Sequence, residues 1–104
     1  MKLYQLSHVG DGEKDTALFT ALPEAERIAA SVWFRLPAPK RKTHSVAVLS
    51  FDADLSKLRE DYLAEYGLPG DIDPHDISVE TWESILYDHG SAVVSGLSTV
   101  AGYP

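Results

Sequence analysis

Hydrophobic positions in the first quarter of the chain follow the short spacing typical of strands. Residues 2–9 (KLYQLSHV) are rich in β-favouring side chains and predict a first strand. The polar, glycine-containing stretch 10–15 predicts a turn, and residues 16–20 (TALFT) predict a short second strand. These segments together predict a β-hairpin.

The clearest helical periodicity follows this hairpin. Pro23 suits a first helical turn, because its missing N–H would have no intrahelical partner there. Apolar residues then recur every three or four positions, at Ala25, Ile28, Ala29, Val32, Trp33 and Leu36. This spacing places them on one face of an amphipathic helix. Pro37 and Pro39 end it.

The middle of the chain predicts a central strand and a second helix. Residues 44–51 (HSVAVLSF) are almost continuously apolar or small, which is typical of a strand buried on both faces. Asp52 or Asp54 can cap a helix over roughly residues 55–66. Gly67 is the residue type expected just after its end.

The last third of the chain predicts a third helix and a closing strand. Residues 68–77 contain two prolines, a glycine and three aspartates and predict a loop. Ser78 can cap a helix that ends at Gly90. Residues 91–95 predict the last strand, and residues 96–104 either add a short edge strand or wrap the surface.

These elements predict one compact α+β domain over residues 1–104, in the order β-β-α-β-α-α-β. About three helices would cover one face of a mainly antiparallel sheet. No internal repeat or long linker divides the chain.

Composition excludes several classes of protein. The chain has no cysteine, which excludes disulfides, thiolate metal sites and cysteine catalysis. It has no apolar run of 18 residues and no secretory signal pattern, so we expect a cytoplasmic protein without a membrane partner. A net charge of −7 also disfavours direct nucleic-acid binding.

Charge is divided unevenly between the two halves of the chain. Residues 1–52 carry seven Lys and Arg against six Asp and Glu, a net charge of +1. Residues 53–104 carry two against ten, a net charge of −8. The acidic residues expected on the outer faces of the second and third helices and on the loop between them are Glu60, Asp61, Glu65, Asp71, Asp73, Asp76, Glu80, Glu83 and Asp88.

Such a run of carboxylates can occupy a basic groove that otherwise holds nucleic acid. The simpler interpretation is a charged face that keeps the protein soluble. The leading hypothesis is a small non-enzymatic interaction protein that binds a basic surface on another protein. An inhibitor from a mobile element would behave in this way.

Metal and catalytic patterns are weaker. Asp71, Asp73, His75 and Asp76 form an oxygen-rich loop, but its spacing does not fit an EF-hand, and we expect turn chemistry rather than a metal site. No two of the four histidines have the spacing of a metal pair, and no G-x-S-x-G elbow is present. We therefore assign no catalytic residue.

Four segments resemble ADP-ribosyltransferase-like proteins: residues 3–8, 18–30, 46–58 and 93–97. The resemblance implies a nicotinamide pocket for NAD near Gln5, Ser7 and Thr20. Gln5 stands where that family commonly has His or Arg, and Ser91 stands where its catalytic glutamate is expected. The alternative function is therefore an NAD-binding enzyme of this type, or a degenerate relic of one.

Overall fold

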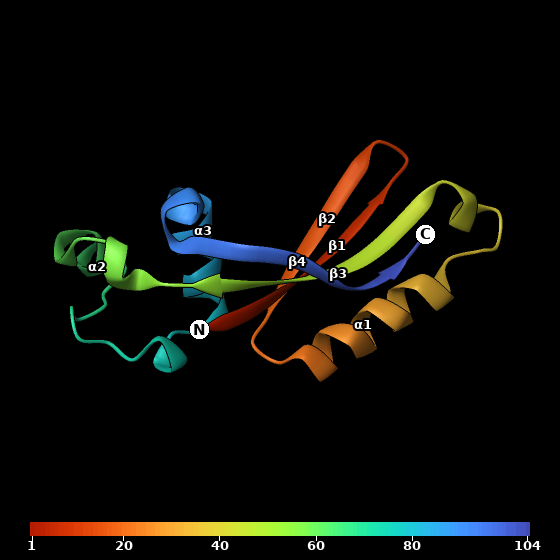
Figure 1. The fold of residues 1–104 in the computed structure, drawn as a ribbon. Coiled ribbons are helices and arrows are strands. Elements are labelled where there is room, and N and C mark those ends of the chain that lie inside the picture. Colours follow the sequence, from red (N-terminus) through yellow and green to blue (C-terminus); the bar gives the residue numbers. More distant parts are fainter.

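The computed structural model describes all 104 residues. Its centre is a four-stranded, fully antiparallel sheet with the strand order β2-β1-β3-β4 (Figure 1). The strands are β1 (Lys2–Gly10), β2 (Glu13–Phe19), β3 (His44–Ala53) and β4 (Val94–Tyr103). The α+β class, the antiparallel sheet and the order β-β-α-β-α-α-β are thereby confirmed.

The hairpin of β1 and β2 is tighter than the sequence predicts. Its two turn residues, Asp11 and Gly12, both have positive φ, 52° and 78°. This conformation matches the twist of the flanking strands, which explains the Asp-Gly pair. β2 therefore begins at Glu13 rather than at residue 16. The charged residues 13–15 are tolerated because β2 is an exposed edge strand there.

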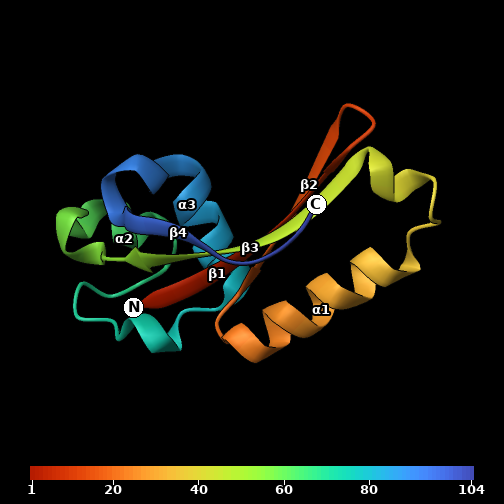
Figure 2. The ribbon, with the colours of Figure 1, turned by 45° about the vertical axis from the view of Figure 1, so that its right-hand side comes forward.

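The prediction that the helices cover one face of the sheet is wrong. α1 (Leu22–Arg35) and α3 (Val79–Val93) lie on opposite faces and at opposite ends of the sheet (Figures 1 and 2). On β1, Leu6 packs with the α1 core, whereas Leu3 packs with the α3 core. Side chains alternate between the two faces of a strand, so one strand can serve both cores.

Each core has its own set of buried residues. The α1 core contains Leu6, Ala25, Ala29, Val46 and Val48, with Trp33 and Tyr103 packed against it. The larger α3 core is built around the fully buried Trp82 and Ile85. The other buried residues of the α3 core are Leu3, Leu18, Phe51, Ala53, Leu55, Leu63, Ile77 and Val93.

The second predicted helix, over residues 55–66, is wrong in extent. The chain instead forms a 3-10 turn at Leu55–Lys57 and the short helix α2 (Glu60–Glu65). Asp54 caps the 3-10 turn by accepting a hydrogen bond from the Ser56 backbone N–H, and extended residues follow before α2. Leu55 and Leu63 both reach the α3 core despite this break.

The end of α3 and the start of β4 also differ from the prediction. The helix runs through Gly90 to Val93, with a kink at His89, whose φ is −132°. Residues 91–93 are therefore helical rather than part of a strand. The tail forms most of the ten-residue edge strand β4, which bends at Gly96 (φ 65°).

The domain is drawn out along its strands, with extents of 49 × 26 × 22 Å. Its radius of gyration is 15.4 Å, whereas ~13 Å is typical for about 100 residues. Placing the two helical layers at opposite ends of the sheet accounts for this shape. No helix has the length and apolar character needed to cross a membrane.

Replacing Ile85 by alanine tests the α3 core. Ile85 is completely buried, so we expect Ile85→Ala to lower the free energy of unfolding by about 2–5 kcal/mol. Tyr87→Ala on the same helix is the control, because that side chain is 92% exposed and should change stability by only about 0.5 kcal/mol. Urea denaturation measures both. Equal effects would contradict the assignment of the core.

Candidate functional site

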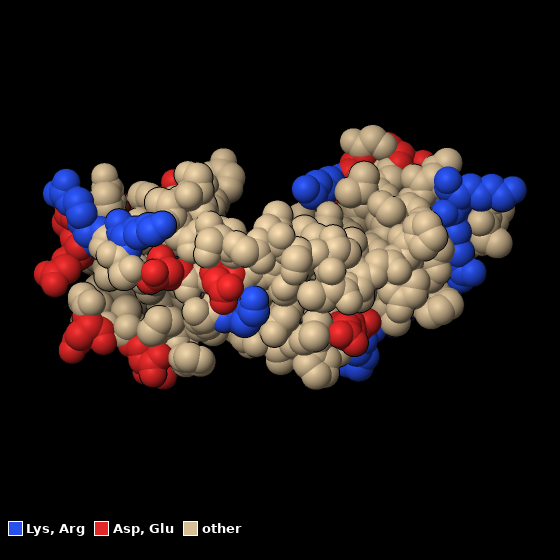
Figure 3. Space-filling view, viewed as in Figure 1, with Lys and Arg blue, Asp and Glu red and all other residues tan.

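The nine predicted acidic residues are all exposed and lie at one end of the molecule. α2 carries Glu60, Asp61 and Glu65, and α3 carries Glu80, Glu83 and Asp88. Asp71, Asp73 and Asp76 lie in the segment between these helices. Figure 3 shows acidic side chains gathered at the end of the molecule that Figure 1 shows to be built from α2 and α3. We call these nine residues the acidic end.

Two of these carboxylates form ion pairs within the chain. Asp61 pairs with Arg59 at 2.8 Å, and Asp73 pairs with His75 at 3.0 Å. The backbone N–H and the ring of His75 both bond to Asp73, which lowers the pKa of that carboxyl below its ordinary value. The other seven residues of the acidic end make no ion pair, and all are exposed.

Asp88 ties the two helices of the acidic end together. The Tyr66 hydroxyl, just after α2, donates a 2.6 Å hydrogen bond to Asp88 Oδ2 on α3. This bond raises the pKa of Tyr66 to about 12 from its ordinary 10.0, because ionised Tyr66 would lose the bond and face the Asp88 charge. The contact links the segment just after α2 to α3.

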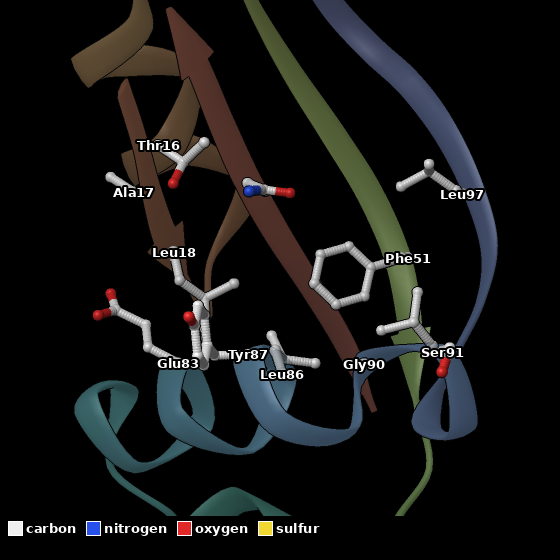
Figure 4. A pocket seen from close by; sticks show the side chains of 12 residues that line it. Thr16, Ala17, Leu18, Phe51, Glu83, Leu86, Tyr87, Gly90, Ser91 and Leu97 are labelled. Atoms are coloured by element: carbon white, nitrogen blue, oxygen red, sulfur yellow. The ribbon is translucent and has the colours of Figure 1, made fainter. Parts of the chain in front are cut away.

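A cleft of about 660 Å³ lies between α3 and the open half of the sheet (Figure 4). Phe51 and Leu97 line it from the sheet, and Glu83 and Leu86 line it from α3. Of the residues implied by the ADP-ribosyltransferase resemblance, Gln5 and Ser91 line this cleft. Ser7 and Thr20 are not among its lining residues.

Tyr87 lies at the border between this cleft and the acidic end. It lines the cleft and also a shallow hollow with Glu80, Glu83, Ser84 and Asp88. Its place outside the apolar positions Val79, Trp82, Ile85 and Leu86 of α3 indicates an exposed tyrosine that could border a cleft, but the sequence does not show which cleft.

Sequence reasoning also missed a hydrogen-bonded chain of two histidines. His8 Nε2 lies 2.8 Å from His44 Nδ1, and His44 Nε2 lies 2.9 Å from Asp11 Oδ2. The bond from His44 lowers the pKa of the Asp11 carboxyl. Gly10 is required beside this chain, because a Cβ there would overlap the His44 ring. The arrangement fastens the hairpin turn to the start of β3.

No group of three or more His, Asp or Glu side chains is placed to hold a metal ion. Asp73 caps the 3-10 segment Pro74–Asp76 by accepting a hydrogen bond from the backbone N–H of His75.

Comparisons with protein-family models, with curated proteins and with solved structures find no match for this chain.

The bond between Tyr66 and Asp88 predicts a change in stability at high pH. A raised folded-state pKa stabilises the protein fully below the unfolded pKa of 10.0, and this stabilisation is lost as the pH rises through about 12. We expect Asp88→Asn to return the pKa of Tyr66 towards 10.0. Near-ultraviolet titration of tyrosine ionisation measures the shift. An unchanged titration curve would contradict the assigned cause.

Proposed function

We propose that this protein is a small non-enzymatic interaction module. Its acidic end binds a basic surface of a partner protein, of the kind that otherwise holds nucleic acid. The observation that carries the proposal is the grouping of nine exposed carboxylates from α2, α3 and the segment between them. Residues 54–88 contain ten acidic and two basic residues, a net charge of −8 within one end of the molecule.

The physical basis is the one that governs binding to phosphates. A row of fixed negative charges attracts Lys and Arg side chains and releases the ions that had screened them. It also accelerates association, and the effect weakens as salt rises. Seven of the nine carboxylates have no ion pair, so binding a partner would break few existing contacts.

This charge pattern supports inhibition by competition rather than catalysis. A protein surface that takes the place of nucleic acid in a basic groove blocks that groove while it remains bound. Inhibitors encoded by mobile elements work in this way, and this chain fits the role by analogy. The hydrogen bond from Tyr66 to Asp88 supports it, because a carboxylate that is already held loses less conformational entropy on binding.

Charge reversal with a matched control tests the location of this surface. The acidic-end variant replaces Glu60, Asp61, Glu80 and Glu83 by lysine. The control replaces four exposed acids of the other half, Glu13, Asp15, Glu24 and Glu26, by lysine. Both variants change the net charge from −7 to +1, so they differ only in where the charge lies.

We expect the acidic-end variant to lose affinity for a basic nucleic-acid-binding partner by about tenfold or more. The control should retain most of it. The assay is capture from cells at low and high salt, elution with duplex DNA, and titration of the purified partner. Equal losses in both variants would indicate bulk charge alone, and unchanged binding of the acidic-end variant would place the interface elsewhere.

The second candidate function is NAD binding in the cleft between α3 and the sheet. The observation that favours it is that Gln5 and Ser91, distant in sequence, line one cleft. The cleft is largely apolar with polar groups at intervals, as ligand sites commonly are. This candidate is the one implied by the ADP-ribosyltransferase resemblance.

Titration of the isotopically labelled protein with NAD tests this second candidate. Binding in the cleft should produce saturable shifts of the backbone amides at Gln5, Leu18 and Ser91, and Gln5→Ala should abolish them. Thr20→Ala is the control, because Thr20 is not a lining residue. The absence of shifts at millimolar NAD would rule out this function.

A further inference from the structure

The outer edge of β4 is an open hydrogen-bonding surface. β4 pairs with β3 along its inner edge and with no other strand. None of the backbone hydrogen bonds outside regular elements involves residues 94–104. Most of its side chains are exposed as well, including Leu97 at 62% and Val100 at 42%. Such an edge presents free N–H and C=O groups to any strand that can approach it.

The two edges of the sheet differ in how they are protected. β2, at the opposite edge, begins with Glu13, Lys14 and Asp15, and charges of this kind prevent pairing between edges. Residues 89–104 contain no Lys, Arg, Asp or Glu, although 24% of the whole chain is charged. In the view of Figures 1 and 3, β4 crosses the middle of the molecule, where charged side chains are few.

We propose that β4 pairs antiparallel with β4 of a second copy of this chain, forming a two-fold symmetric dimer with one continuous eight-stranded sheet. A two-fold contact uses the same surface on both copies, so a strand that lacks charge lacks it on both sides. Two copies that each carry −7 repel one another, chiefly through their acidic ends. At the β4 edge they can approach without bringing like charges together.

Symmetry sets the register of this pairing. Successive residues of a strand point to opposite faces, whereas residues directly opposite across two antiparallel strands point to the same face. The two-fold axis therefore passes between one residue and its own copy. Ser98 already bonds to Ser50 of β3. We therefore place Thr99, which is exposed and near the middle of β4, opposite Thr99 of the second copy.

Charge complementarity also favours a second copy in this orientation. β4 starts next to the acidic end, because it follows α3 directly. It ends at Tyr103, which stacks on Trp33, and Trp33 in turn accepts a hydrogen bond from Arg41. Antiparallel pairing therefore sets the acidic end of each copy beside the basic segment Lys40–Lys42 of the other. A parallel arrangement would set the two acidic ends together.

Light scattering during size-exclusion chromatography tests the proposal at high micromolar concentration. We expect wild type to have twice the 11.4 kDa mass of one chain and Val100→Lys to have the mass of one chain. Val9→Lys is the matched control, because Val9 is 43% exposed but lies on the inner strand β1. It should remain dimeric. A monomeric wild type, or a dimer that Val100→Lys leaves intact, would overturn the proposal.

Disulfide cross-linking tests the pairing of β4 with β4 of a second copy even if the Val100→Lys protein fails to fold. The chain has no cysteine, so introduced cysteines react only with one another. Thr99 of the two copies would be directly opposite one another, so Thr99→Cys protein should form a cross-linked dimer upon mild oxidation. Val9→Cys should not form one. Failure of Thr99→Cys to cross-link, or equal cross-linking of the control, would overturn the β4 pairing.

Discussion

The alternation of side chains along β1 and β3 is the constraint on which the rest of this structure depends. Leu3 and Leu6 point to opposite faces of the same strand and enter different cores. β3 divides in the same way, with Val46 and Val48 in the α1 core and Phe51 in the α3 core. Each face of the sheet is thus covered by helices over only one half of its length. The cleft between α3 and the sheet begins where that cover stops.

This division also explains why the uneven distribution of charge along the sequence becomes an uneven distribution of charge on the surface. α2, α3 and the segment between them all contribute apolar residues to one core, so their polar faces point outward at the same end. The acidic residues of 54–88 occupy those outward faces. The rest of the chain builds the sheet and α1 with a net charge of +1. The acidic residues therefore gather at one end of the molecule because the helices that carry them pack on the α3 core.

The sequence predicted the elements that depend on local pattern. The periodicity from Ala25 to Leu36 and the apolar run in residues 44–51 correspond to α1 and β3. The helix over residues 55–66 failed because its apolar spacing was compatible with two shorter elements, once Asp54 capped a 3-10 turn. The strand at 91–95 failed because Gly90 did not end α3, which continues after a kink.

Features that depend on strand register could not be predicted from the local sequence pattern. His8 and His44 meet only because β1 and β3 pair with Gly10 opposite His44. Gln5 and Ser91 share a cleft only because α3 crosses one end of the sheet. The acidic residues were easier to predict, because a polar residue on an amphipathic helix faces solvent wherever the helix packs. That these acidic residues group at one end of the molecule could be seen only in the fold.

Pairing through β4 would use only part of the acidic end, because the three basic residues Lys40–Lys42 of the second copy lie beside nine carboxylates. Antiparallel pairing would also place the acidic ends of the two copies at opposite extremes of the dimer. Since the domain extends 49 Å along its long axis, these two acidic surfaces would be well separated and related by a two-fold axis. That is the symmetry of proteins that bind nucleic acid as dimers on two half-sites. A two-fold partner could then be engaged at both of its basic grooves by one dimer, with the gain in avidity that linked sites provide.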